Sequence, residues 1–270
     1  MQKTTEVAGM DFHHENFLRR SRYATVFFVL LIAFGAITVL NINTGNVHIS
    51  VENILKIIFL RQGEEMEYNI IWKIRLPRIL MAAILGGGLS LSGFLLQTFF
   101  ENPIAGPFVL GISSGAKMIV ALAMIYFIGH YQVVSSYTLI IAAFIGSLIA
   151  TGFILLVSRR VQHMATLLVA GIMIGYICSA VTDFVVTFAE DSDIVNLHGW
   201  SQGSFSGMSW SNVQVAAIVV GIAALLAFLM SKPIGAYQLG EAYAQSMGVN
   251  IKAFRVILIL LSSILSACVT

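Results

Sequence analysis

The feature that most constrains this chain is the length of its apolar runs. Apolar residues make up 58% of the 270 residues, and charged residues only 10%. A soluble domain has about 25% charged residues, so this chain has too few polar side chains to cover a water-facing surface. The runs are continuous and do not alternate in the ~10-residue pattern of β-barrel strands. We therefore predict an all-α membrane protein with a polytopic helical bundle.

The bundle is predicted to have seven visible spans. A bilayer core of about 30 Å needs about 20 helical residues. The apolar runs of about this length are residues 23–40, 79–100, 114–128, 136–157, 164–188, 212–230 and 253–270. The third is short, so we expect it to tilt little or to take residues from its flanks. We expect a cytosolic tail at 1–22 and one transmembrane domain at 23–270.

The distribution of basic residues predicts the orientation of the bundle in the membrane. With the N-terminus in the cytosol, the inner loops carry nine Lys and Arg and the outer loops five, which favours this orientation. The outer five are Lys56, Arg61, Lys73, Arg75 and Arg78. Two explanations fit them: interfacial anchoring of long side chains, or a docking surface for an acidic partner outside the membrane.

The outer loop 41–73 contains a second helical pattern. Ser50 precedes residues 51–60, and its hydroxyl is well placed to cap a short helix. We expect this amphipathic helix to lie at the membrane surface. Its apolar face is predicted to consist of Val51, Ile54, Leu55 and Ile58.

The inner loop 231–250 carries a similar pattern. Pro233 is expected to end the sixth span. Residues 239–247 then predict a short helix, closed by Gly248 as a left-handed cap. Asn250 is expected to start the next helix. A compact, nearly uncharged helical turn of this kind fits a groove on a cytosolic partner, although a plain surface turn has the same composition.

The chain shows no pattern typical of catalysis. It has no G-x-x-x-x-G-K-[ST] loop, no H-E-x-x-H and no C-x-x-C. Cys178 and Cys268 lie in separate apolar runs, where we interpret them as small packing residues. We predict a protein that is not an enzyme, with no cofactor, no metal site and no nucleic-acid partner.

The second span has one face of small residues. Ala82, Gly86, Ser90, Gly93 and Gln97 recur at steps of three and four, so they share one side of a helix. Such a face permits close helix packing. Alternatively, Gln97 faces the bundle interior or a pathway. Met164, Met173 and Asp183 on the fifth span are further path candidates, although gap-filling packing also explains the methionines.

A turn rich in Pro and Gly follows the second span. Its marked positions are Asn102, Pro103, Gly111 and Gly115. Irregular backbone at membrane depth is tolerated only where protein or a water-filled cavity covers it. We expect a covered turn, with Ser113 or Ser114 capping the third span.

Three ordered motifs resemble one known family. The run RLPRILMAAILGGGLSLSGFLLQTFFENPIAGPFVLGISSGA (75–116) is similar to the signature of the FecCD family, the iron-siderophore and cobalamin permeases of ATP-binding-cassette (ABC) importers. Ile104 replaces the usual Leu. GWSQGS (199–204) with Trp210, and LGEAYAQSMGVN (239–250), resemble two further family segments. The resemblance covers residues 75–270.

The resemblance implies a subunit of a larger assembly. It implies a second permease subunit (homodimer or heterodimer), two cytosolic ATP-binding subunits and an extracytoplasmic substrate-binding protein, in the bacterial cytoplasmic membrane. Arg75 and Arg78 would dock the binding protein, and the fifth span would line the path. The residues implied in coupling to the ATPase are Leu239, Gly240, Ala244, Met247, Gly248 and Val249. The implied cargo is an iron-siderophore complex, haem or cobalamin.

One departure from the family concerns length. Members have about ten spans and a G-x-I-x-F-x-G-L-x-x-P-H motif after the seventh, whereas this sequence stops at Thr270. It thus lacks the last three spans, which leaves a non-functional truncated permease as an alternative. An ion-coupled secondary transporter would need intramembrane charges, for which Asp183 and Lys117 are the candidates. A membrane scaffold or receptor would not need the 239–250 segment.

Overall fold

The chain is helical throughout the part that the structure describes. The computed structural model describes residues 2–45, 47, 49–128, 136–158, 160–161 and 164–270, and no strand occurs among them. The predicted all-α class is confirmed. The chain divides into two compact units, Met1–Ile79 and Leu80–Thr270, whereas the sequence predicted a boundary at residue 22.

The first unit consists of one long helix and a folded segment after it. Its elements are α1 (Gln2–Asn43), α2 (Val51–Leu55), the π-helix η1 (Lys56–Leu60), α3 (Glu65–Asn69) and the π-helix η2 (Ile70–Arg75). The predicted tail at 1–22 is therefore part of α1. The predicted outer loop also ends earlier than expected, because α3 and η2 continue into α4 (Leu76–Phe100) as a single apolar helix, Glu65–Phe100.

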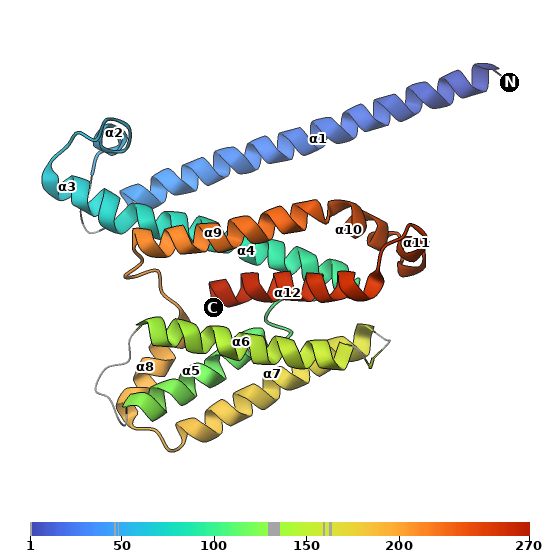
Figure 1. Cartoon of the computed structure of the whole chain (residues 1–270). Coiled ribbons are helices and arrows are strands. Elements are labelled where there is room, and N and C mark those ends of the chain that lie inside the picture. The colour runs from blue at the N-terminus through green and yellow to red at the C-terminus, as the bar shows by residue number, and fades with distance from the viewer. Residues whose placement is uncertain (1, 46, 48, 129–135, 159, 162–163) are drawn as a thin grey trace. The chain divides into compact units, whose positions relative to one another are not determined.

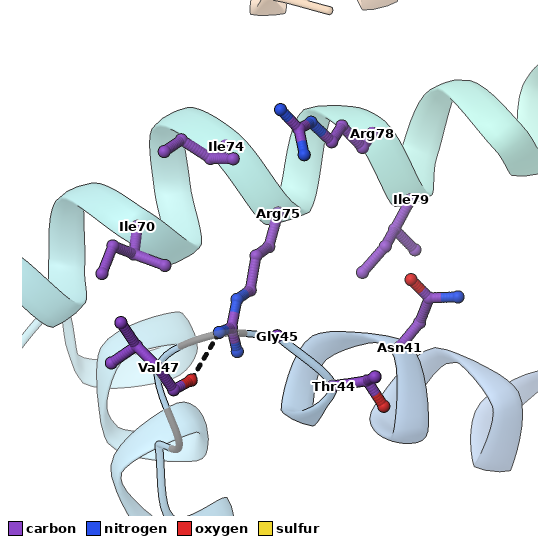
Figure 2. A pocket seen from close by; sticks show the side chains of 9 residues that line it. All are labelled: Asn41, Thr44, Gly45, Val47, Ile70, Ile74, Arg75, Arg78 and Ile79. Carbon is purple, nitrogen blue, oxygen red and sulfur yellow. Dashed lines mark hydrogen bonds between the residues drawn. The ribbon is translucent and has the colours of Figure 1, made fainter. Parts of the chain in front are cut away.

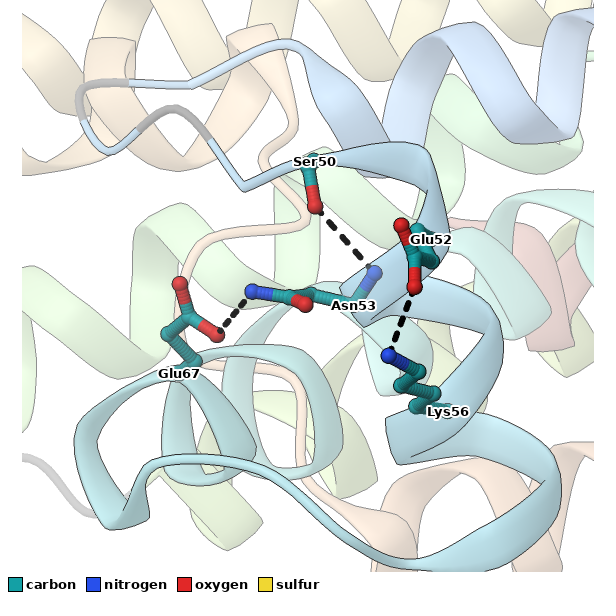
Figure 3. Close-up of polar contacts among 5 residues, drawn as sticks. All are labelled: Ser50, Glu52, Asn53, Lys56 and Glu67. Atoms are coloured by element: carbon teal, nitrogen blue, oxygen red, sulfur yellow. Dashed lines mark hydrogen bonds and ion pairs between the residues drawn. The ribbon is translucent and has the colours of Figure 1, made fainter.

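Polar contacts fix the start of α2 (Figure 3). The Asn53 backbone N–H donates to Ser50 Oγ at 3.2 Å, so the predicted cap is present. Asn53 Nδ2 donates to Glu67 Oε2 at 3.2 Å and joins α2 to α3. Lys56 Nζ lies 2.6 Å from Glu52 Oε1, and this hydrogen-bonded ammonium lowers the pKa of the Glu52 carboxyl.

The apolar face of this segment differs from the predicted one. Ile54 and Ile57 are buried, together with Ile42, Ile49 and Ile71, in a small core. Val51 and Leu55, expected on the same face as Ile54, are exposed. The second half of the helix is π-helical, which changes the period from Lys56 onward: Ile57 is buried there, whereas the predicted Ile58 is half-buried.

The second unit contains the remaining helices. They are α5 (Ile112–Ile128), α6 (Ser136–Ser158), α7 (Met164–Val186), α8 (Asp191–Gln202), α9 (Trp210–Leu229), α10 (Ser231–Gln238), α11 (Glu241–Ser246) and α12 (Ile251–Val269). Each of the seven predicted spans coincides with a helix. Six helices among the described residues are long and apolar enough to cross a membrane, and the third predicted span, α5, is shorter.

Two groups of helices make up this unit (Figure 1). α4, α9 and α12 lie side by side, and reciprocal serine contacts join α4 to α12: Ser92 Oγ lies 2.7 Å from Ser262 Oγ. α5 packs against α6, α7 and the short helix α8. A shared core of buried side chains from α4, α7, α9, α10 and α12 extends through the unit.

Two short helices occur where the sequence predicted loops. α8 lies between the predicted spans 164–188 and 212–230, and α10 follows the sixth span directly. Pro233 does not end that span: α9 ends at Leu229, and Pro233 is the third residue of α10. A proline is tolerated there because N–H groups in a first turn have no partner within the helix.

Candidate functional site

The two arginines of the RLPR motif have different environments. The Arg75 guanidinium is half-buried and donates to the backbone carbonyls of Ile42 and Val47, the latter at 2.6 Å. Ile42 lies in the last turn of α1, where carbonyls lack helical partners. A positive charge is favourable at that end of a helix. Arg75 therefore fastens the loop after α1.

Gly45 leaves room in this loop for the Arg75 side chain. A Cβ added at Gly45 would lie 2.5 Å from Arg75 Nη2, so a larger residue would push the guanidinium away. Figure 2 shows Arg75 pointing into this loop and Arg78 pointing away from it. Arg78 is exposed, and none of the described residues pairs with it. Both belong to the lining of a cavity of about 400 Å³ within the first unit.

The turn after α4 is fixed by the motif residues themselves. Gln97 Nε2 donates to the Pro103 carbonyl at 3.1 Å, and Asn102 Oδ1 accepts from the Ile104 N–H at 2.9 Å. Glu101 takes a left-handed conformation (φ 49°) that ends α4. Gln97 and Asn102 thus stabilise this turn locally, a role that their spacing in the sequence does not reveal.

Glycines let α5 approach its neighbours closely. Gly111 has φ 68°, and a Cβ there would lie 2.7 Å from the Gly175 nitrogen of α7. A Cβ on Gly115 would lie 2.7 Å from the Gly146 carbonyl oxygen of α6. Ser113 does not serve as the expected cap, because α5 begins at Ile112 and the Ser113 hydroxyl lies 3.2 Å from Thr270 Oγ1.

The α10–α11 segment presents an apolar ridge. Leu239 and Met247 are 71% and 65% exposed, and Tyr243 between them is exposed as well. Ala244, next to Tyr243 in α11, is fully buried and belongs to the core of the unit. Gly240 (φ 117°) and Gly248 (φ 85°) bracket the helix in conformations that favour glycine.

Both predicted caps of this segment are present. The Gly248 N–H donates to the Gln245 carbonyl, and the Val249 N–H to the Ala244 carbonyl, as in a left-handed helix end. Asn250 Oδ1 accepts from the Ala253 N–H at 3.2 Å and starts α12. The segment is therefore a shaped surface and not a plain loop.

A model of the FecCD transport family matches residues 30–270. The chain belongs to this family. The match begins within α1 and includes the RLPR motif, the turn after α4 and the α10–α11 segment. Its family and its apolar helices make the chain a multi-pass protein of the cytoplasmic membrane.

Two curated FecCD-type relatives show the extent of the likeness. The hemin transport system permease protein HmuU of Yersinia pestis is 36% identical over 197 residues, which are 72% of this chain and 59% of that protein. The vitamin B12 import system permease protein BtuC of Klebsiella pneumoniae is 34% identical over 189 residues, 70% of this chain and 56% of that protein. The chain thus spans less than two thirds of either relative.

The fold is also shared with a solved structure. A structure described as an inward-facing metal-chelate type ABC transporter matches with a TM-score of 0.77 and 24% identity, over 91% of this chain and 74% of that one. At this level of identity the likeness establishes the fold alone.

The path candidates of this FecCD-family chain do not gather in one cavity. Met164 packs against the core of the second unit, whereas Met173 and Asp183 are exposed on α7. Gln97 is exposed on α4 while its amide is held by the turn. Their role in a pathway stays a prediction.

Metal ligands do not cluster in the described part of the chain, where no group of three or more His, Cys, Asp or Glu side chains comes together. His130 and His163 lie outside the described residues.

Proposed function

We propose that this chain is a permease subunit of a binding-protein-dependent ABC importer for a metal chelate, namely an iron-siderophore complex, haem or cobalamin. Among its structural features, the α10–α11 segment carries this proposal. Family membership and the names of the two relatives, which refer to hemin and to vitamin B12, support the class of cargo.

The ridge on α10–α11 is suited to an ATP-binding subunit in the cytosol. Leu239, Tyr243 and Met247 offer an exposed apolar surface on α11 and the residues that flank it, and short helices with such a surface enter grooves on partner proteins. The buried Ala244 holds the ridge against the membrane unit. When two ATP-binding subunits close on ATP, the ridge moves with them, and the bundle alternates between outward and inward access.

The ridge can be tested directly. Leu239→Asp combined with Met247→Asp alters only exposed side chains, so we expect normal insertion but a loss of at least tenfold in co-purified ATP-binding subunit. Lys252→Gln, an exposed change on α12, is the matched control. Undiminished co-purification of the double variant would contradict the coupling role. Gly248→Pro and Ala244→Trp are expected to uncouple ATP hydrolysis from uptake.

The RLPR arginines are proposed to serve the binding protein on the outer side. Arg78 is free to meet an acidic side chain, whereas Arg75 shapes the surface around it. Reversing both to Glu is expected to weaken docking. Arg78→Glu alone should weaken it at least fivefold, more strongly at low salt, with unchanged thermal stability.

Arg75→Gln separates the two roles. It should lower thermal stability by loosening the loop after α1, and it should weaken docking less than Arg78→Glu. Equal losses of docking in both variants, at equal stability, would show that the two arginines act alike. Salt-insensitive, undiminished docking of the doubly reversed variant would contradict the outer docking site.

The cargo is the last part of the proposal to test. Cells with the intact importer should accumulate one of three radiolabelled cargoes, ferric siderophore, haem or cobalamin, in an ATP-dependent manner that a proton uncoupler does not abolish. Uptake that collapses with the ion gradient while ATP is maintained would instead favour the ion-coupled transporter.

A further inference from the structure

An ion pair joins α11 to α12. Arg255 Nη2 lies 2.6 Å from Glu241 Oε2, and the Arg255 side chain is only 20% exposed. Glu241 is the first residue of α11, and Arg255 lies in the second turn of α12. The Glu241 side chain is 45% exposed, so salt partly screens the pair. The contact joins the start of α11 to α12.

A tyrosine joins the same region to the end of α4. Tyr237 of α10 is almost fully buried, and its ring centroid lies 5.1 Å from that of Phe254 on α12. Its hydroxyl donates to the Phe99 carbonyl at 3.4 Å, a long contact that supplements the ring packing. Phe99 lies in the last turn of α4, where carbonyls lack helical partners.

Charged groups of the ion pair and of the turn after α4 act on the Tyr237 hydroxyl. Burial raises the pKa of the Tyr237 hydroxyl, which therefore stays a neutral donor at physiological pH. Arg255 opposes this shift, whereas Glu241 and Glu101 reinforce it. Arg255 thus acts on Tyr237 as well as on Glu241. Glu101 belongs to the turn after α4, two residues beyond Phe99, whose carbonyl accepts from the Tyr237 hydroxyl.

Arg255 is not fully satisfied in this arrangement. Its Nε is buried and has no hydrogen-bond partner among the described residues. A buried donor without a partner makes the arrangement less stable than a fully hydrogen-bonded one.

We propose that Tyr237, Glu241 and Arg255 form a clasp that transmits displacement of α11 to the end of α4. Coupling between separated sites needs a contiguous set of packed and hydrogen-bonded groups, and the clasp provides one from the apolar ridge to the turn after α4. The three are positioning residues, because they act through the ridge and the turn. This inference rests on the proposed coupling to an ATP-binding subunit.

The test measures cargo transported per ATP hydrolysed in proteoliposomes that contain the chain with its partner subunits. Glu241→Gln and Arg255→Gln should each lower this ratio about fivefold or more, while the ATP-binding subunits stay bound and basal hydrolysis continues. The exchanged pair, Glu241→Arg with Arg255→Glu, should recover at least half of the ratio. Lys252→Gln should leave it unchanged.

A purely structural role would give another result. If the ratio of cargo to ATP falls in the single variants and does not recover in the exchanged pair, each residue acts alone. An unchanged ratio in both single variants would overturn the clasp. Tyr237→Phe keeps the ring and removes only the hydroxyl, so it should lower the ratio less than Arg255→Gln. An effect of Tyr237→Phe equal to that of Arg255→Gln would contradict the ion pair as the main link.

A second measurement separates the clasp from the proposed function. In the detergent-solubilised chain alone, Glu241→Gln should speed amide hydrogen exchange in Glu241–Ser246 at least threefold, with no change in α5 and α6. Unchanged exchange would overturn the clasp without reference to any ATP-binding subunit. Normal clasp behaviour without ATP-dependent transport by the unaltered chain would instead contradict the proposed function.

Discussion

Two sets of small residues in this chain pack differently in the structure. The open stripe on α4 contains Ala82, Gly86, Ser90 and Gly93. The closed set, where α5 crosses α6 and α7, contains Gly111, Gly115, Gly146 and Gly175. At the crossings, an added Cβ would meet backbone atoms of the neighbouring helix. On α4, no atom lies within 4 Å of a Cβ built at Gly86 or Gly93.

The difference shows that residue spacing predicts which side chains share one face of a helix, but not whether another helix packs against that face. The crossings of α5 hold the second unit together, since backbone meets backbone there. The α4 stripe packs against no described helix of its unit, and Ala82, Gly86 and Ser90 are exposed. Tight packing was one of the two interpretations of this face. The pathway interpretation stays a prediction, as does contact of this open face with a second permease subunit.

The largest loss of stability is expected in the closed set of glycines, where α5 crosses α6. Gly146→Ala would place a methyl group against the backbone of Gly115 and Ala116, which cannot move aside as a flexible side chain does. We expect a loss of about 3 kcal/mol in the free energy of unfolding, at the upper end for overpacking. Denaturation in mixed micelles measures it. Gly152→Ala on the same helix, with nothing within 4 Å, is the control; equal losses in both would remove the distinction.

A smaller loss is expected at the turn into α5. Gly111→Ala combines a left-handed backbone (φ 68°) with contacts of 2.7 and 2.8 Å to the Gly175 backbone. We expect a loss of about 2 kcal/mol from strain and overpacking together. Gly106→Ala in the same turn meets no neighbour and should be tolerated. A stable Gly111→Ala variant would show that the turn can shift away from α7.

On the open stripe of α4, a change from glycine to alanine should not lower stability and should raise it slightly. Gly86→Ala meets no atom within 4 Å, and alanine is the better helix former by about 1 kcal/mol. We therefore expect equal or slightly higher thermal stability for Gly86→Ala. A loss above about 1 kcal/mol would indicate that another helix covers this face.

The smallest effect on stability is expected from a large side chain on the open stripe. Gly93→Leu should change the melting temperature of the chain very little, because the position has free space. If the face lines a path or meets a second subunit, cargo uptake should nevertheless fall at least tenfold. Normal uptake by Gly93→Leu would remove both roles from this face.

The spans were predictable because the bilayer imposes their length and composition. Each predicted span lies within a few residues of a helix in the structure. The sequence did not predict α8 and α10, because short polar helices have neither the length nor the apolar composition of a membrane span. The helical caps at Ser50 and Asn250 were predicted correctly, since a cap contacts a neighbour only three residues away.

The contacts of the candidate site were harder to predict. Arg75 binds backbone carbonyls 28 and 33 residues earlier in the chain, and a carbonyl acceptor leaves no mark in the sequence. Arg255 and Glu241 lie 14 residues apart and meet only because α11 turns back on α12. The sequence indicated which segments carry function, whereas the partners of individual side chains depend on how those segments pack.

The π-helical stretch before α4 affects how the chain accommodates a change in its own length. Ile70–Arg75 accommodates one residue more than an α-helix would hold in its turns. Deleting a single residue there would let the helix relax to α geometry with its flanking turns nearly in register, because five α-helical residues turn through about the same angle as six π-helical ones. A one-residue deletion within α4 itself would instead turn the helix before it by about 100°. The π-helical stretch thus tolerates a change in length that the α-helix after it does not.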